Sequence, residues 1–189
     1  MFIIAGPNGA GKTTASMEYL KYDLDCLEFI NADNIAVGIS PFQPEKVSVT
    51  AGKIMLNRID ELIESGNNFA IESTLSSKLL ADKCLYAKKK GFEIIILFYW
   101  LESSDLAVER VEHRVSLGGH NIPVDIIKRR YERGLKNLFQ DFMSISDYWL
   151  IVNNSGLFPS NIAEGNKYSI KVFNEDLWDL IKGSYGKGI

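Results

Sequence analysis

One stretch near the start of the chain limits its fold more than any other: Gly6-Pro7-Asn8-Gly9-Ala10-Gly11-Lys12-Thr13-Thr14. It fits the pattern G-x-x-x-x-G-K-[ST] of a phosphate-binding loop, and the apolar run Phe2–Ala5 before it predicts a buried strand. Its glycines lack a Cβ, so backbone N–H groups can turn inward around a phosphate. Lys12 supplies a point charge for the β- and γ-phosphates, and the Thr13 hydroxyl suits Mg²⁺. We therefore expect residues 6–14 to bind ATP together with Mg²⁺.

Length and charge exclude several other classes. A chain of 189 residues fits one domain, and we expect residues 1–189 to form it. The net charge of −3 argues against a general role on nucleic acid or at a membrane surface. The N-terminus does not resemble a signal peptide, and the longest apolar run, Ile94–Leu101, is too short to span a bilayer. Cys26 and Cys84 lack metal-site spacing, which suggests reduced thiols in a cytoplasmic protein.

Strand-like and helix-like segments alternate along the chain. The expected strands are Phe2–Ala5, Leu27–Asn31, Asn68–Glu72, Glu93–Leu101, Tyr148–Asn153 and Ser169–Phe173. The expected helices are Lys12–Tyr22, Pro44–Ser65, Ser77–Lys90, Ser104–Val115, Pro123–Met143 and Glu175–Lys182. The strands lack polar alternation, as in a parallel sheet that is covered on both faces. The pattern predicts an α/β fold, a three-layer P-loop NTPase domain with a mostly parallel sheet.

Two carboxylates follow neighbouring strands, at the edge of the sheet where ligands gather in open α/β folds. They are Asp33, within Asn31-Ala32-Asp33-Asn34, and Glu72, which precedes Ser73-Thr74. Transfer of a phosphoryl group to a hydroxyl needs one carboxylate to accept the proton and another to organise Mg²⁺ or hold the acceptor. Asp33 could instead be a helix N-cap or part of an Asx-turn, and Glu72 a solvated charge or a metal-serving acid.

A basic segment surrounds a glycine hinge in the second half of the chain. Arg110 and Arg114 lie four residues apart, followed by the hinge Ser116–Pro123 and by a helix whose basic residues are Lys128, Arg129, Arg130, Arg133 and Lys136. Arginines beside a hinge are typical of a mobile lid that brings guanidinium groups to a transferring phosphoryl group. We expect the lid to span about residues 110–133. The alternatives are a solvated helix face for the arginines and a structural role for His120.

These segments together resemble one family. GPNGAGKTT, NADNIA, ESTLS and RVEHRVSLGGHNIP leading into RRYERGLKNL are similar to motifs of the zeta-toxin-like P-loop kinases, most of all their small, stand-alone branch. The resemblance runs from Phe2 to about Asn153. It implies a fold like that of nucleoside monophosphate kinases, with strand order 2-3-1-4-5. It also implies phosphorylation of a small-molecule hydroxyl, such as the sugar 3′-hydroxyl of UDP-N-acetylglucosamine, and a small antitoxin partner that blocks the nucleotide site.

The resemblance assigns roles by position. Lys12 and Thr13 match the residues that hold phosphates and Mg²⁺, and Asp33 matches the general base. Glu72 and Thr74 match the acceptor-side carboxylate and hydroxyl, and Arg110 matches the first lid arginine.

Two departures from the family pattern affect the site. The family's second catalytic arginine lies three residues before the lid proline, where this chain has His120. Arg114, Arg129 and Arg130 are the candidates to replace it, and we count Arg114 and Arg130 among the expected catalytic residues. The segment after Asp33 also lacks the Phe-Arg pair of the toxins, so the acceptor pocket is expected to differ.

Two other functional classes share the P-loop. GPNGAGKTT is common in ABC-transporter ATPases, and Ser116–His120 is superficially similar to their signature motif. The residue order differs, however, and no apolar run ending in Asp-Glu follows. An ATP-binding regulator without phosphoryl transfer is the remaining alternative to a small-molecule kinase.

Overall fold

The computed structural model, which describes residues 1–14, 20 and 26–186, has strands and helices in alternation. The strands are β1 (Phe2–Ala5), β2 (Glu28–Asn31), β3 (Phe69–Ser73), β4 (Ile95–Trp100), β5 (Tyr148–Asn153), β6 (Ser160–Gly165) and β7 (Ile170–Val172). The helical segments are α2 (Ala32–Ile39), η1 (Pro44–Val47), α3 (Ser48–Ser65), α4 (Leu79–Lys89), α5 (Ser104–Ser116), α6 (Val124–Asn137), η2 (Leu138–Phe142), α7 (Met143–Ile145) and α8 (Glu175–Tyr185). Most of the helix expected over Lys12–Tyr22 falls outside the described residues.

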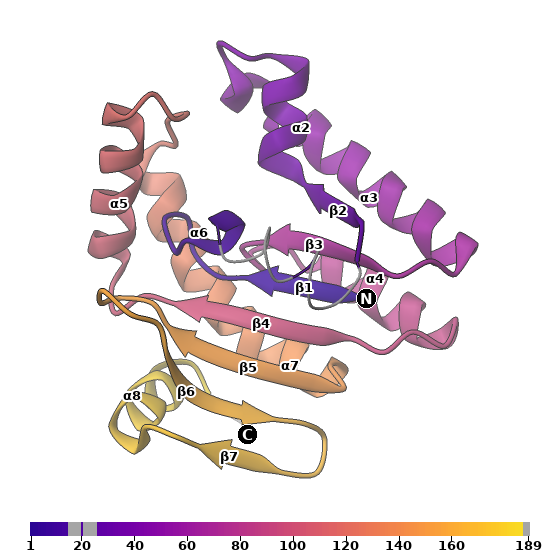
Figure 1. Cartoon of the computed structure of the whole chain (residues 1–189), viewed down its shortest axis with the longest axis vertical. Helices are drawn as coiled ribbons and strands as arrows, with labels where there is room; N and C mark the ends of the chain where they lie inside the picture. Colours follow the sequence, from indigo (N-terminus) through magenta and orange to yellow (C-terminus); the bar gives the residue numbers. More distant parts are fainter. Residues whose placement is uncertain (15–19, 21–25, 187–189) are drawn as a thin grey trace.

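The described strands form one seven-stranded sheet in the order β2-β3-β1-β4-β5-β6-β7. The first five of these strands pair in parallel, whereas β6 and β7 add an antiparallel extension at one edge. Helices α4, α6 and α7 lie behind the sheet in Figure 1, and α2 and α3 lie at its β2 edge. The predicted α/β class and the strand order 2-3-1-4-5 are confirmed.

The register of the parallel strands aligns their carboxyl ends. Glu72 of β3 pairs with Ile4 of β1 on one side and with Asn31 of β2 on the other. Chain segments that leave β1, β2 and β3 therefore start at the same edge of the sheet, which is where ligands bind in open α/β folds. The P-loop leaves β1 at this edge, and α2 leaves β2.

Neighbouring residues of one strand pack on opposite faces of the sheet, as the strand period of two requires. The larger hydrophobic cluster contains Ile3 and Ile71, and the smaller one contains Ile4 and Ala70. Burial of apolar side chains on both faces explains why these strands read as continuous hydrophobic runs. Among the described residues, no helix is long and apolar enough to cross a membrane.

Three elements differ from the sequence-based expectation. Strand β6 was not predicted because Ser160-Asn161-Ile162-Ala163-Glu164-Gly165 contains few β-branched residues, yet it pairs with β5 along most of its length. Helix α2 was not predicted either, because Asn31-Ala32-Asp33-Asn34 has the composition of a turn. The helix expected over Pro123–Met143 is interrupted by the π-helical turn η2.

Gly134 lets helix α6 approach the end of β3. A Cβ at this position would lie 2.3 Å from the carbonyl oxygen of Thr74. We expect Gly134→Ala to lower the free energy of unfolding by about 1–3 kcal/mol, the usual cost of an overpacked site. Urea unfolding followed by circular dichroism measures the change.

Gly52→Ala in α3 is the matched control, because no neighbouring atom lies within 4 Å of its added Cβ. There the same substitution should stabilise the helix by about 0.5–1 kcal/mol. Equal effects at the two glycines would show that the close approach of α6 to Thr74 does not matter for stability.

Candidate active site

The P-loop joins β1 to a helical turn at Lys12–Thr14 and depends on its glycines. Gly6, Gly9 and Gly11 have φ angles of 138°, 79° and 78°, values that side-chain-bearing residues rarely adopt. A Cβ on Gly6 would also lie 2.3 Å from the carbonyl oxygen of Tyr99 on β4. The loop therefore takes a left-handed backbone path that only glycine allows, as a loop that wraps N–H groups around an anion requires.

Lys12 is a buried cation, with 6% of its surface exposed. Its Nζ donates a hydrogen bond to the carbonyl oxygen of Pro7 at 2.8 Å and lies 3.8 Å from Glu72 Oε1. Burial lowers the pKa of the Lys12 ammonium, and the nearby carboxylates of Glu72 and Asp33 oppose that shift. A charge held away from water interacts strongly with an anion that comes next to it.

Thr13 and Glu72 bring two hard oxygens together beside Lys12. Thr13 Oγ1 donates to Glu72 Oε2 at 2.8 Å. Hydroxyl and carboxylate oxygens are the ligands that Mg²⁺ prefers, so these two residues fit that ion. No cluster of three or more His, Cys, Asp or Glu that could hold a metal occurs in residues 1–14, 20 and 26–186. A Mg²⁺ ion here would take its other ligands from phosphates and water, as is usual at such sites.

Asp33 lies in the first turn of α2, but it is not the helix cap. The side chain of Asn31 caps the helix, because its Oδ1 accepts from the backbone N–H groups of Asp33 and Asn34 at 2.7 and 3.2 Å. Asp33 Oδ2 lies 3.7 Å from His120 Nε2. Burial raises the pKa of the Asp33 carboxyl, but His120, Arg130 and Lys12 outweigh that effect and hold it below its ordinary value. Asp33 is thus an ionised acceptor at neutral pH.

The hinge region brings Arg114 and His120 together. Arg114 Nη2 lies 3.1 Å from the His120 carbonyl oxygen and 3.4 Å from its Nε2. Arg114 Nε is buried and has no hydrogen-bond partner among the described residues. Arg110, one turn earlier on α5, donates from Nη2 to the Ser155 carbonyl oxygen at 2.8 Å. An unpaired guanidinium N–H at this edge can donate to a bound anion.

Two adjoining cavities meet at this edge of the sheet. The first, here named the P-loop cavity, has a volume of about 420 Å³ and is lined by Asn8, Gly9, Gly11, Lys12, Thr13, Thr14, Asn31, Asp33, Asn34, Glu72, Arg110, Arg114 and His120. The second, the side cavity, has about 360 Å³ and is lined by Ala32, Asp33, Ala36, Pro44, Glu45, Ser48, His120, Asn121, Ile122, Pro123, Ile126, Arg129 and Arg130. Asp33 and His120 line both cavities, so they form a shared wall.

Most of the residues that the sequence predicted for the site line one of these two cavities, and they fall into two groups. Lys12, Glu72 and Arg114 line the P-loop cavity, whereas Arg130 lines the side cavity. Glu72 lines only the P-loop cavity and accepts a hydrogen bond from Thr13, so its position suits the metal better than the acceptor. Thr74 lines neither cavity, and its hydroxyl is hydrogen-bonded to that of Ser76 at 2.9 Å.

Sequence reasoning missed the support that β5 gives to the P-loop. Asn154, directly after β5, donates from Nδ2 to the Ala10 carbonyl oxygen at 2.9 Å. A Cβ on Gly11 would lie 2.9 Å from the same amide nitrogen. The polar run Asn153-Asn154-Ser155 at a strand end is the signal that could have pointed to this contact.

Comparison of the chain with known protein families agrees with a phosphate-binding site of this kind. The family model described as Zeta toxin matches residues 43–161, more than half of the chain. The chain belongs to the zeta toxin family. The match begins after the P-loop and Asp33, so those features support the assignment independently of it. By family and by fold this zeta toxin relative is a P-loop kinase.

Individual relatives agree with the zeta toxin assignment. An uncharacterized protein of Haemophilus influenzae is 31% identical over 127 residues, which cover 67% of this chain and 88% of that protein. The PezAT toxin–antitoxin structure of Streptococcus pneumoniae matches with a TM-score of 0.62 at 20% identity, over 95% of this chain and 77% of that one. The AvrRxo1-ORF1:AvrRxo1-ORF2 complex with sulphate ions matches with a TM-score of 0.73 at 15% identity, over 95% of this chain. This chain spans only 62% of the length of that matched chain. The structural likenesses show a shared fold.

Proposed function

We propose that the protein transfers the γ-phosphoryl group of ATP to a hydroxyl of a small molecule. The observation that carries this proposal is the wall shared by the two cavities, in which the Asp33 carboxylate faces both. A general base must be able to reach the acceptor hydroxyl while that hydroxyl lies next to the γ-phosphate. In this arrangement one domain, residues 1–189, carries both binding sites.

ATP occupies the P-loop cavity. The backbone of residues 6–14 surrounds the phosphates, and Lys12 leaves its Pro7 contact to bind the β- and γ-phosphates. Thr13 and Glu72 hold Mg²⁺, which neutralises phosphate charge when bound. A related fold, AvrRxo1-ORF1:-ORF2, has been solved with ATP, which supports the choice of nucleotide.

The acceptor occupies the side cavity. Asp33 takes the proton of its hydroxyl as the oxygen–phosphorus bond forms and the bond between the γ-phosphorus and the β-phosphate oxygen breaks, which releases ADP. Arg129 and Arg130 favour an acceptor that carries an anionic group, and Ala36, Ile122 and Ile126 supply an apolar wall for its remaining part. UDP-N-acetylglucosamine, an anionic nucleotide sugar, meets these requirements. Thr74, which lines neither cavity, is left outside this acceptor site.

Residues 110–133 act as the lid over both substrates. Arg114 lines the P-loop cavity and has an unpaired Nε, and it replaces the second arginine of the family pattern by binding the charge that develops on the transferring group. Arg110 holds the chain after β5 through the Ser155 carbonyl oxygen and, as a lining residue of the P-loop cavity, contacts phosphate there. Arg130 serves the acceptor.

The direct test uses γ-labelled ATP and a panel of nucleotide sugars, nucleosides, sugar phosphates and uncharged sugars. We expect label in an anionic hydroxyl compound and none in uncharged sugars. ATP binding by calorimetry without labelled product from any acceptor would contradict the kinase proposal and favour an ATP-binding regulator. The ABC-type ATPase alternative is set aside because the chain belongs to the zeta toxin family.

Arg114→Lys tests the lid. Lysine keeps the charge but loses the planar fork, so we expect kcat to fall by about 10²-fold with little change in the KM for ATP. Initial rates with the acceptor found above measure it. Arg133→Lys on α6 is the control, because Arg133 lines neither cavity and should leave kcat unchanged. Equal rates for wild type and Arg114→Lys would remove Arg114 from the mechanism.

His120→Ala tests the link to Asp33. His120 helps to keep the pKa of the Asp33 carboxyl low against the opposing effect of burial. Without His120 that pKa should rise, so the base becomes protonated at higher pH and the acidic limb of the kcat/KM profile shifts upward. His113→Ala, which removes the other histidine from an exposed position on α5, should leave the limb in place. An unshifted limb in His120→Ala would show that His120 does not act on Asp33.

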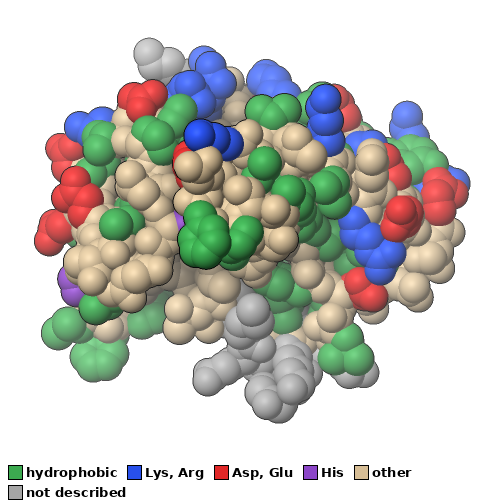
Figure 2. All heavy atoms as spheres, turned by 90° about the horizontal axis from the view of Figure 1, so that it is seen from above, with side chains coloured by type: hydrophobic (Ala, Val, Ile, Leu, Met, Phe, Trp, Pro, Cys, Tyr) green, Lys and Arg blue, Asp and Glu red, His purple; other side chains and the backbone are tan. Residues whose placement is uncertain are grey.

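A small partner protein, an antitoxin, covers the mouth of the side cavity. Exposed Val37, Ile39, Phe42 and Val49 surround the segment that contributes Pro44 to that cavity. Figure 2 looks onto this end of the molecule and shows hydrophobic side chains gathered near its centre. Exposed apolar groups of this kind mark interaction surfaces. The PezAT and AvrRxo1-ORF1:AvrRxo1-ORF2 structures belong to relatives that have partner chains.

The protein acts in the cytoplasm, where its buried thiols Cys26 and Cys84 stay reduced.

A further inference from the structure

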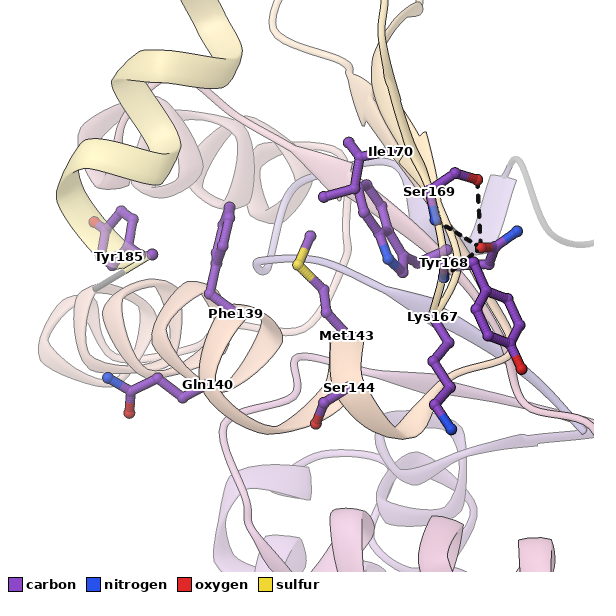
Figure 3. A pocket seen from close by; sticks show the side chains of 12 residues that line it. Phe139, Gln140, Met143, Ser144, Lys167, Tyr168, Ser169, Ile170 and Tyr185 are labelled. Carbon is purple, nitrogen blue, oxygen red and sulfur yellow. Dashed lines mark hydrogen bonds between the residues drawn. The ribbon is translucent and has the colours of Figure 1, made fainter. Parts of the chain in front are cut away.

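A third cavity, of about 790 Å³, lies away from the P-loop and is larger than either cavity of the site. It is bounded by the helical segments η2 and α7, by the hairpin between β6 and β7, and by the end of α8 (Figure 3). The start of β5 contributes Trp149, so this groove opens near the amino ends of the parallel strands, whereas the P-loop lies at their carboxyl ends. Nothing in the proposed kinase mechanism uses this groove.

The floor of the groove is apolar and well supported. Phe139, Met143 and Trp149 form it, with exposures of 2%, 7% and 2%. Trp149 stacks on Trp178 with ring centroids 5.8 Å apart. In Figure 3, Phe139 and Met143 rise from the helix toward the hairpin, where Ile170 lies opposite them. A rigid aromatic floor of this kind binds an apolar side chain without having to reorder itself.

An open strand edge borders the groove. β7 is the last strand of the sheet order, and among the described residues it pairs only with β6. Ile170 of β7 lines the groove and is 45% exposed, and Tyr168 beside it is 88% exposed. An uncovered edge strand next to an apolar pocket is the arrangement by which proteins bind an extended peptide, with main-chain hydrogen bonds for affinity and a pocket for a side chain.

The charges around the groove select the partner. A smaller cavity of about 370 Å³ adjoins it through Gln140 and Tyr185, which line both. The basic residues that line these two cavities are Lys167, Arg133 and Lys136. None of them forms an ion pair with a described residue. Glu132, the one carboxylate lining them, accepts a hydrogen bond from the Tyr185 hydroxyl at 3.0 Å. The rim therefore carries a local positive charge on a chain whose net charge is −3.

We propose that this groove binds an acidic segment of a partner protein, which lies extended along β7 and places an aromatic or aliphatic side chain on the Phe139–Met143–Trp149 floor. Its carboxylates face Lys167, Arg133 and Lys136. A nucleic acid would also match the charge, but the open strand edge offers backbone N–H and C=O groups that pair with a peptide. The proposal is independent of the kinase function, because the groove shares no lining residue with the P-loop cavity or the side cavity.

A phage-displayed library of short random peptides tests the proposal, with the immobilised full chain as bait. We expect the enriched peptides to combine Asp or Glu with Phe, Trp, Leu or Ile. A selected peptide, labelled and measured by fluorescence anisotropy, should bind more weakly as the salt concentration rises. Lys136→Glu combined with Lys167→Glu should weaken it by about tenfold or more, because two attractions become repulsions. Ile170→Lys, which replaces an apolar rim residue by a charge, should weaken it as well.

The matched control is Lys53→Glu combined with Lys89→Glu, two exposed lysines on α3 and α4, which should leave peptide affinity unchanged. ATP binding should be the same in all three variants, which also shows that they are folded. Several results would overturn the proposal: no enrichment, enrichment of basic peptides, equal loss in the control, or binding of a single-stranded oligonucleotide in place of peptide. Self-association that the Lys136→Glu/Lys167→Glu variant abolishes would assign the groove to a second copy of the chain instead.

Discussion

Lys12→Ala is expected to lower phosphoryl transfer by at least about 10²-fold and to weaken ATP binding. In the structure the Lys12 ammonium is buried within the P-loop and bonded to the loop itself, which leaves it ready to contact the β- and γ-phosphates. Alanine removes both the point charge and its hydrogen bonds at the place where the charge on the nucleotide is largest. Calorimetric titration with ATP and initial rates with labelled ATP measure the two effects separately.

The thermal unfolding midpoint is a second measurement, which shows whether Lys12→Ala is still folded. ATP should raise the thermal unfolding midpoint of the wild type, because a ligand that binds only the folded state stabilises it, and this rise should be lost in Lys12→Ala. Lys53→Ala, at an exposed lysine of α3, should keep both the rise and the activity. Wild-type turnover in Lys12→Ala would rule out the kinase and the ATPase interpretations together.

Asp33→Asn is expected to reduce transfer by about 10² or more while ATP affinity stays near normal, the scale usual for loss of a general base. Asparagine keeps the shape of the side chain, and the helix cap is unaffected because Asn31 provides it. The amide cannot take the acceptor's proton, so only the chemical step should suffer. Single-turnover rates at saturating ATP report on that step directly.

Asp125→Asn is the matched control for Asp33→Asn. Asp125 is also an acidic residue in the first turn of a helix, α6, so its loss removes the same interaction with the helix dipole without touching either cavity. It should leave transfer unchanged. A fall of less than about fivefold in Asp33→Asn together with weaker ATP binding would show that Asp33 supports the fold and is not the base.

The sequence predicted those parts of the molecule that depend on local patterns. The P-loop is contiguous, and its glycine spacing alone indicates a left-handed backbone path, which the φ angles of Gly6, Gly9 and Gly11 confirm. The parallel strands were predicted because burial on both faces makes them uniformly apolar. Strand β6 was missed because its pairing with β5 outweighs a composition that does not favour strands.

The parts that could not be predicted depend on contacts between distant segments. Asn154 follows β5, two strands away from β1 in the sheet, and its side chain donates to the Ala10 carbonyl oxygen. No local sequence pattern indicates that contact. The fold separates basic residues of the helix that follows the hinge, since Arg129 lines the side cavity while Arg133 and Lys136 line the cavity beside the β7 groove. Sequence spacing places residues on one helix face, but packing against other elements decides what that face meets.

Asp33 and His120 form a wall between the two cavities, and this wall has a consequence for the stereochemistry of the reaction. In the proposed reaction, donor and acceptor bind on opposite sides of that wall at the same time, and the phosphoryl group passes between them in one in-line displacement. Such a displacement inverts the configuration at phosphorus. With ATP made chiral at the γ-phosphorus by oxygen isotopes, the product should be the mirror-related form, and initial rates should follow a sequential rather than a ping-pong scheme. Retained configuration would instead require a phosphorylated residue of the chain as an intermediate.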